Sequence, residues 1–369
     1  MPYEKYELPK YPCASDMWDE LKNEKRPIVV YGMGNGADKL IEKLDSIGVE
    51  IADFFASDGF VRGHLFHGKR VKSFSEIKAE YPDFVILLSF ASNRPEVLSM
   101  LREISEKYTM LVPDLPIAGV DEYFDREFYN LHYKEITSAM SSLADDDSKN
   151  LFAAVVNYRL TGKAEYLFNS FSTKSELYSL LPCKKIESYA DLGAYNGDTL
   201  AEAIEYFPNL KRALLVEPDA KNFKRLLRFT ENVEGIELMP VNAAAWCFDG
   251  DGEFSQSGNR NSTASATASH EHKTTPVSLR RLDSLVTERV DFVKYDVEGA
   301  ELEALLGSDE TIKKYTPALL VSLYHRSRDI FFLVNMLREK YEGYKLYLRR
   351  LPCLPAWEID LIMISEEIQ

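Results

Sequence analysis

The sequence predicts an α/β protein built from two doubly wound, mostly parallel sheets joined by a helical segment. Short apolar β runs alternate with amphipathic helical runs over residues 26–118 and again from residue 186 onward. A glycine-containing turn follows the first strand of each series. Strands that alternate with helices pair in parallel through right-handed crossovers. We therefore expect an N-terminal arm, a smaller Rossmann-like domain, a helical connector and a larger Rossmann-like domain, over residues 1–25, 26–118, 119–181 and 182–369.

Composition excludes several classes of protein. The chain has 369 residues, 45% of them hydrophobic and 28% charged, which is typical of folded domains. Lys and Arg number 44 against 59 Asp and Glu, and the net charge of −15 disfavours nucleic acid as a partner. No apolar run approaches the roughly 18 residues of a membrane span, and residues 1–26 contain no signal-peptide core. Cys13, Cys183, Cys247 and Cys353 have no paired spacing, so we expect reduced thiols and a cytoplasmic protein.

The first domain begins with a strand that runs into a glycine-rich turn. Gly32, Gly34 and Ala37 match the dinucleotide fingerprint with Ala in third place, and Asp53 or Asp58 could contact a ribose. A nucleotide or nucleotide-sugar site is one interpretation, and a structural or dimer-forming role is the other. We expect the order strand 27–31, helix 37–44, strand 49–55, helix 73–81, strand 84–88, helix 94–108 and strand 110–112.

The connector and the second domain follow from the same patterns. We expect connector helices over 123–140, 145–160 and 172–181. In the second domain we expect strands 186–192, 213–216, 236–241, 291–295, 318–323, 344–350 and 358–364, and helices 200–206, 222–229, 300–306 and 329–341. The polar residues 250–274 predict a hairpin or a loop over the ligand, in which Arg260, Asn261, Ser262 and Thr263 could hydrogen-bond a sugar.

Three strand ends of the second domain carry candidate ligand-binding residues. Ligands of parallel sheets bind beyond the carboxyl ends of the strands. The first strand ends in a turn over 191–197, and the next ends at Glu217, an acid placed to accept hydrogen bonds from both hydroxyls of a ribose. Asp198 stands beside the helix N-terminus where a diphosphate would otherwise bind. S-adenosylmethionine, which has a ribose and no phosphate, therefore fits better than a nicotinamide dinucleotide.

Four motifs in order resemble the FkbM-type S-adenosylmethionine-dependent methyltransferases: residues 191–200, 214–226, 279–285 and 291–307. The resemblance implies a class I methyltransferase sheet with an antiparallel C-terminal hairpin, and O-methylation of sugars or other small molecules. It implies that Asp191, Gly193, Ala194 and Gly197 line the methionine and ribose side, that Glu217 holds the ribose, and that Asp219, Asn242, Ala243 and Ala244 flank the adenine. Tyr195, Asn196, Pro218 and Asp296 complete the expected cofactor set.

Methyl transfer to a hydroxyl gains from a general base, by roughly 10²–10⁴-fold. His325, Asp296 and Glu298 are the candidates, beside Lys294, and we favour His325 because its ordinary pKa suits the task. Asp296 and Glu298 could instead hold a divalent metal, which is not favoured because no third oxygen ligand is evident. We expect a saccharide, a glycan precursor or another hydroxylated metabolite as acceptor, and a homodimer is compatible with the sequence.

Two alternatives from other classes remain open. One is a nucleotide-sugar-binding protein whose methyltransferase fold has no turnover. The other is an NAD-dependent sugar epimerase or dehydrogenase centred on residues 32–37.

Overall fold

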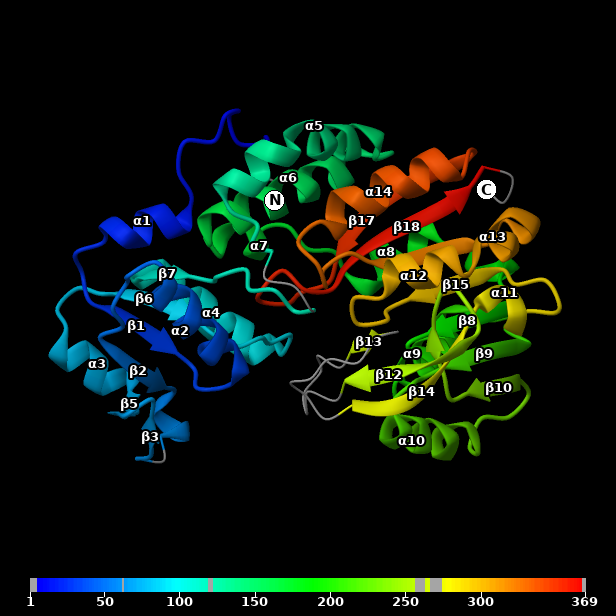
Figure 1. Cartoon of the computed structure of the whole chain (residues 1–369), viewed down its shortest axis with the longest axis horizontal. Helices are drawn as coiled ribbons and strands as arrows, with labels where there is room; N and C mark the ends of the chain where they lie inside the picture. Colours follow the sequence, from blue (N-terminus) through cyan, green and yellow to red (C-terminus); the bar gives the residue numbers. More distant parts are fainter. Residues whose placement is uncertain (1–4, 62, 119–121, 256–262, 266–273, 367–369) are drawn as a thin grey trace.

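Two sheets lie side by side in the computed structural model of the chain, one in each predicted α/β region (Figure 1). The structure describes residues 5–61, 63–118, 122–255, 263–265 and 274–366. Of the predicted sugar-binding residues in the polar segment, Arg260, Asn261 and Ser262 lie outside this range, and only the backbone of Thr263 is described. In the described part of the chain, no helix is long and apolar enough to cross a membrane.

The first sheet is entirely parallel, with strand order β5-β2-β1-β6-β7. Its strands are β1 (Ile28–Tyr31), β2 (Asp53–Ala56), β5 (Lys72–Ser73), β6 (Val85–Leu88) and β7 (Thr109–Leu111). The other elements are α2 (Asn35–Ser46), η1 (Asp58–Phe60), β3 (Leu65–Phe66), β4 (Lys69–Arg70), α3 (Phe74–Glu80) and α4 (Pro95–Lys107). Ser73 and Glu76 form the capping box that starts α3. The sheet has five strands, against the four that apolar runs predict, because β5 is too short to leave such a run.

Part of the predicted N-terminal arm is a helix. The helix α1 (Met17–Asn23) is capped by Asp16, whose side chain accepts a hydrogen bond from the Asp19 amide. It buries Met17, Trp18 and Leu21 in the core between α2 and the first sheet. Sequence analysis missed this helix because two turns with three apolar positions give too little periodicity.

The second sheet has seven strands in the order β10-β9-β8-β15-β16-β18-β17, and it is parallel except for β18. The predicted mostly parallel sheet with an antiparallel C-terminal hairpin is therefore confirmed. Its strands are β8 (Ser188–Leu192), β9 (Arg212–Val216), β10 (Glu237–Val241), β15 (Phe292–Tyr295), β16 (Ala318–Ser322), β17 (Tyr344–Arg350) and β18 (Ile359–Ser365). Its helices are α9 (Asp198–Tyr206), α10 (Ala220–Thr230), α11 (Leu282–Leu285), α12 (Glu301–Leu306), α13 (Asp309–Tyr315) and α14 (Asp329–Lys340). A small sheet contains β11 (Ala244–Ala245), β12 (Gly250–Ser255), β13 (Thr263–Ser265) and β14 (Thr274–Arg280).

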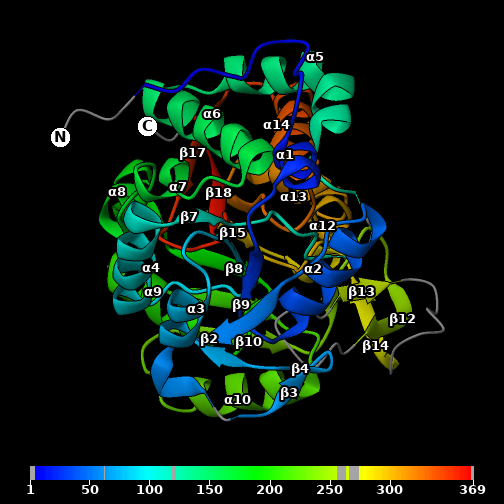
Figure 2. The same ribbon diagram turned by 90° about the vertical axis from the view of Figure 1, so that its left-hand side faces the viewer.

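The helices that connect the first sheet to the second in the sequence pack on the second sheet. They are α5 (Arg126–Ser142), α6 (Asp146–Thr161), α7 (Glu165–Phe168), α8 (Lys174–Leu180) and the short η2 (Cys183–Lys185). α5 packs on α14 and α6 on β17, so both cover the C-terminal part of that sheet, as the two views show (Figures 1 and 2). The buried Ser148 hydroxyl accepts a hydrogen bond from the Leu348 amide at 2.8 Å, and Asp145 pairs with Arg349 at 2.7 Å. These helices are a layer of the second domain as well as a connection.

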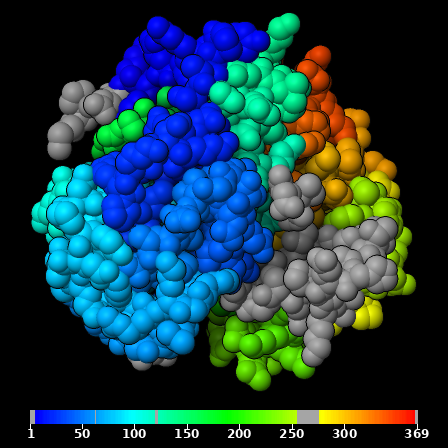
Figure 3. All heavy atoms as spheres, turned by 60° about the vertical axis from the view of Figure 1, so that its left-hand side comes forward, coloured from blue at the N-terminus to red at the C-terminus, as the bar shows by residue number. Residues whose placement is uncertain are grey.

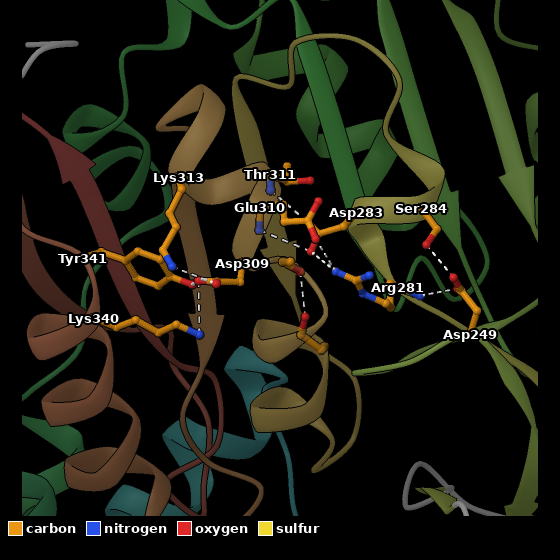
Figure 4. Close-up of polar contacts among 12 residues, drawn as sticks. Asp249, Arg281, Asp283, Ser284, Asp309, Glu310, Thr311, Lys313, Lys340 and Tyr341 are labelled. Atoms are coloured by element: carbon orange, nitrogen blue, oxygen red, sulfur yellow. Dashed lines mark hydrogen bonds and ion pairs between the residues drawn. The ribbon is translucent and has the colours of Figure 1, made fainter.

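The motif over residues 279–285 has a structural role (Figure 4). The Asp283 carboxylate accepts a hydrogen bond from the Thr311 amide at 2.7 Å, and Arg281 bridges Asp283 and Glu310 at 2.8 and 3.0 Å. Asp309 pairs with Lys313 in the same helix. These contacts fix the N-terminus of α13 beside α11. None of these residues lines the cavity described below.

Candidate active site

A cavity of about 1350 Å³ lies at the carboxyl ends of β8, β9 and β15 and reaches the first domain. Figure 3 shows the two domains in contact on one face of the molecule. Nine predicted site residues line the cavity: Gly193, Tyr195, Glu217, Pro218, Asp219, Ala244, Lys294, Asp296 and Glu298. Seven others predicted in the second domain do not: Asp191, Ala194, Asn196, Gly197, Asn242, Ala243 and His325. The three predicted strand ends therefore meet at one cavity.

The turn after β8 needs its two glycines for close packing. Gly193 has φ +96°, and a Cβ there would lie 1.9 Å from the carbonyl oxygen of Asp296 at the end of β15. Gly197 has φ +94°, and its Cβ would lie 2.6 Å from the Phe229 ring of α10. Tyr195, between them, also has positive φ, and 40% of its surface is exposed. The turn is thus held against β15 on one side and α10 on the other.

Glu217 ties this turn to the end of β9. Its Oε2 accepts a hydrogen bond from the Tyr195 amide at 2.9 Å, and its Oε1 accepts one from the Asp219 amide at 2.8 Å. Asn242 Nδ2 donates to the Glu217 carbonyl at 2.8 Å. Burial of the side chain raises the pKa of Glu217 to about 8. The carboxyl group therefore faces the cavity in a desolvated position with both oxygens already oriented.

Asp191 lies beneath the turn. Its side chain is fully buried and accepts a hydrogen bond from the Thr199 hydroxyl at the start of α9. Burial raises the pKa of Asp191 above its usual value. Asn196 accepts a hydrogen bond from the Asp198 amide at 3.3 Å. Both residues support the turn from outside the cavity.

The end of β15 contributes a Lys–Asp pair to the cavity wall. Lys294 Nζ lies 3.0 Å from Asp296 Oδ2, and the Tyr324 hydroxyl donates to Asp296 Oδ1 at 3.1 Å. Burial alone would raise the pKa of Asp296, but the charges of Lys294 and His325 lower it to about 2. Burial alone would lower the pKa of Lys294, but the charges of Asp296 and Asp191 raise it. Both groups are therefore charged near neutral pH.

His325 lies behind this wall, with 1% of its surface exposed. Its Nδ1 is 3.0 Å from Glu301 Oε1, and its Nε2 is 3.5 Å from Glu298 Oε2 and 3.7 Å from Asp296 Oδ1. Burial alone would lower the pKa of His325, but the carboxylates of Glu301 and Glu298 raise it well above its usual value. A ring that already carries a proton near neutral pH cannot accept another, so the pKa argument that favoured His325 as the base does not apply at this position.

Glu298 faces the cavity from the turn after β15. Its backbone has φ +55°, a conformation that costs free energy in a residue with a side chain. Burial raises the pKa of Glu298 above its usual value. Of the three base candidates, Glu298 combines a place in the wall with a raised pKa.

Sequence analysis missed an acidic group on β18. Asp360 and Glu358 line the cavity, and burial together with the charge of Glu358 raises the pKa of Asp360 to about 8. Because β18 runs antiparallel to β16, with Ser322 opposite Asp360, its first residues lie at the carboxyl edge of the parallel strands. The signal in the sequence that could have predicted these residues is the pair of acidic residues at the start of the last strand. The cavity also includes residues of α4 and the turn before it, of which Asn93, Ser99 and Arg102 are polar.

The glycine-rich turn of the first domain has packing reasons for its sequence. A Cβ at Gly32, which has φ +118°, would lie 2.6 Å from the Ser89 hydroxyl, and Ala37 is fully buried. Gly34 caps α2 and has open space around it. Asp58 accepts hydrogen bonds from the hydroxyl and amide of Ser75 at 2.6 and 3.2 Å. None of these residues lines the cavity described above.

Asp53, the other expected ribose ligand, opens β2 instead of following it. It therefore lies at the opposite edge of the sheet from the glycine-rich turn. There it accepts hydrogen bonds from Lys72 at 2.7 Å and from the Tyr81 hydroxyl at 2.5 Å. Asp53 is thus excluded as a ribose ligand for that turn.

The sheet order of the C-terminal domain is that of a methyltransferase fold. Residues 191–346 match the family described as "Methyltransferase FkbM domain". Residues 191–346 therefore form an FkbM methyltransferase domain, which confirms the resemblance noted in the sequence and the predicted S-adenosylmethionine cofactor.

One solved structure resembles nearly the whole chain, namely methyltransferase FkbM from Methylobacillus flagellatus KT. The likeness covers 92% of this chain and 90% of that chain, with a TM-score of 0.68 and 22% identity, and it shows the fold. An rRNA methylase from Streptococcus thermophilus covers 52% of this chain and 92% of its own, with a TM-score of 0.34 and 9% identity. The likeness to Aeropyrum pernix fibrillarin, with natively bound S-adenosyl-L-methionine, covers 52% of this chain and 74% of that chain, with a TM-score of 0.33 and 13% identity. The last two scores are too low to carry an argument. No curated protein matches the chain.

Proposed function

We propose that this protein transfers the methyl group of S-adenosylmethionine to a hydroxyl of a saccharide, a glycan precursor or another small hydroxylated metabolite. The observation that carries the proposal is that Glu217 and Glu298 line the same cavity. The Glu217 carboxyl group suits the ribose of the cofactor, and the Glu298 carboxyl group suits the reacting hydroxyl of the acceptor. An in-line transfer needs cofactor and acceptor side by side, and such placement supplies much of the acceleration.

The cofactor half of the cavity is the part around Glu217. Each Glu217 oxygen accepts one backbone N–H and keeps a lone pair, so the two ribose hydroxyls can each donate to one oxygen. Asp219 and Ala244 would flank the adenine, and Gly193 and Tyr195 the methionine tail. Asp191 would act through the turn, because it does not line the cavity.

The acceptor half is the part around Asp296, Glu298 and Asp360. These groups and the Tyr324 hydroxyl offer several hydrogen-bond acceptors and donors at short range, which suits a molecule with several hydroxyls. The excess of carboxyl groups over Lys294 disfavours an acceptor that carries a phosphate or carboxylate here. A saccharide or a similar polyol therefore fits this half better than an acidic metabolite.

Glu298 would take the proton from the acceptor hydroxyl as the oxygen attacks the methyl group. A raised pKa brings a carboxylate closer to the operating pH and makes it a better base. Asp296, with a pKa of about 2, is a weak base and would orient the hydroxyl. Lys294 and Tyr324 hold Asp296 in place for that task.

Transfer of a labelled methyl group tests this function. The protein is incubated with methyl-labelled S-adenosylmethionine and a fractionated pool of saccharides and small metabolites, and labelled products are identified by mass spectrometry. Glu217→Ala should abolish both cofactor binding and labelling, and Glu205→Ala, an exposed acid on α9, should change neither. Cofactor binding without any labelled hydroxyl compound would contradict the proposed reaction.

We also propose a cytoplasmic location. All four cysteines have free thiols, although Cys13, Cys183 and Cys247 are only half-buried. A reducing compartment keeps such thiols free. Localisation of a tagged protein by cell fractionation tests this.

A further inference from the structure

We propose that Asp296, Glu301 and His325 bind one divalent transition-metal ion behind the acceptor half of the cavity. One possible ligand atom from each of these residues lies within 4.8 Å of those of the other two. The three residues come from the turn after β15, from the first turn of α12 and from the segment after β16. The site therefore joins three separate elements. The proposal concerns metal binding and does not depend on the identity of the acceptor.

Buried polar atoms in this cluster have no aligned hydrogen bond. Both ring nitrogens of His325 and Oε2 of Glu301 are in this state, and each residue is 1% exposed. Three carboxylate oxygens lie 3.0, 3.5 and 3.7 Å from the ring nitrogens. Buried polar groups without such partners are rare, and a bound ion is one accepted reason for them. A metal ion among these atoms would displace the acidic proton of the His325 ring and give each of these atoms a partner.

The charges around the cluster favour a cation. The side chains of Asp296, Glu298, Glu301 and Asp329 surround His325 from the turn after β15, from α12 and from α14. Of the neighbouring cations, Lys294 contacts Asp296 at Oδ2, whereas the oxygen of Asp296 near His325 is Oδ1. Arg326 Nε donates to the Gly299 carbonyl at 2.7 Å. Burying several carboxylates is costly unless positive charge accompanies them. A metal ion would supply two such charges.

The ligand set indicates the kind of ion. Imidazole suits zinc, copper, iron and nickel, whereas a site for magnesium or calcium is built from oxygen ligands. One imidazole with two carboxylates therefore favours Mn²⁺, Fe²⁺ or Zn²⁺. The sequence pairs Asp296 with Glu298, which gives too few ligands, whereas the structure places Asp296 with Glu301 and His325.

Such an ion would also stiffen the cavity wall. Glu301 Oε1 accepts hydrogen bonds from the Val297 amide at 3.0 Å and the Gly299 amide at 3.3 Å, so Glu301 already holds the turn that carries Glu298. The ion would thus connect the buried side of this turn to Asp296, which faces the acceptor. The direct consequence is metal binding, which can be measured without any substrate.

Metal titration of the full-length protein tests the proposal. The protein is stripped with a chelator and titrated with Mn²⁺, whose bound fraction is followed by electron paramagnetic resonance, and with Zn²⁺ by calorimetry. We expect one bound ion per chain. Glu301→Gln and His325→Gln should each weaken binding by about tenfold or more. His67→Gln, at an exposed His–Asp pair of the first domain, is the matched control and should not weaken it.

Failure of the metal site is separable from failure of the methyltransferase function. Circular dichroism and S-adenosylmethionine binding are measured on every variant, and Asp296→Asn, at the most exposed ligand, serves if a buried variant does not fold. Absence of stoichiometric binding by the wild-type protein would overturn the proposal, as would unchanged affinity in the folded variants. In either case the charge of the carboxylates is balanced by a protonated His325 together with Lys294.

Discussion

Gly193 and Asp296 approach each other so closely that a Cβ on Gly193 would lie 1.9 Å from the Asp296 carbonyl oxygen. This contact joins the turn that carries the cofactor half of the cavity to the strand end that carries the acceptor half. The two strands are direct neighbours, with Leu192 opposite Tyr295. The distance between the two halves is therefore fixed by main-chain packing and does not depend on flexible side chains.

Gly193→Ala should destabilise the protein and abolish cofactor binding. The substitution combines a positive φ with a main-chain clash, and together these cost about 2–5 kcal/mol. The free energy of unfolding from urea titration and calorimetry with S-adenosylmethionine measure both effects. Gly235→Ala is the matched control, because Gly235 has φ +77° and nothing within 4 Å of its Cβ. Equal losses of stability in the two variants would contradict the role given to this contact.

Affinity for S-adenosylmethionine should rise with pH up to about pH 8. The ribose hydroxyls donate to an ionised Glu217, whereas the free protein holds this carboxyl protonated below its pKa of about 8. Binding below that pH must release a proton, so the affinity should gain up to about tenfold per pH unit between pH 6 and 8 and then level off. Calorimetry between pH 6 and 8 measures the affinity for S-adenosylmethionine. Glu217→Gln should bind weakly with a flat profile, and a flat wild-type profile would refute the pairing with the ribose.

Glu298→Gln should lower kcat by about 10²–10⁴-fold, because the amide cannot accept the proton of the acceptor hydroxyl. The affinity for S-adenosylmethionine should stay within about twofold, since Glu298 lies in the acceptor half. Steady-state rates with the acceptor found by labelling provide the measurement. Glu205→Gln, an exposed acid on α9, is the control. A wild-type rate in Glu298→Gln would remove Glu298 from the chemistry.

Ser99→Trp should raise the KM for the acceptor by about tenfold or more without changing the affinity for S-adenosylmethionine. Ser99 lines the cavity from α4, so a large ring there would occupy acceptor space and leave Glu217 untouched. Ser46→Trp, at an exposed serine that ends α2 outside the cavity lining, should change neither quantity. A change in cofactor affinity with an unchanged KM would show that the first domain faces the cofactor and not the acceptor.

The sequence predicts the strand ends well because apolar runs and glycines are local signals. The turn after β8, Glu217 and the end of β15 come together as expected, since parallel strands place their carboxyl ends on one edge. Which side chains reach the cavity depends on side-chain direction and depth, and this separates Glu298 from His325, two residues that the sequence ranks together. The place of Asp360 depends on an antiparallel register. Glu301 lies within the motif over residues 291–307, but its contact with His325 depends on how α12 packs against the segment after β16.

The layer formed by α5 and α6 on β17 bears on how this protein can be divided. Family membership is defined over residues 191–346, yet the strand of Leu348 and Arg349 is held by Ser148 and Asp145, well upstream. We expect a recombinant fragment that begins at residue 182 to leave β17 and α14 uncovered and to aggregate. A fragment that keeps the fold should therefore also include α5 and α6, upstream of the matched family region.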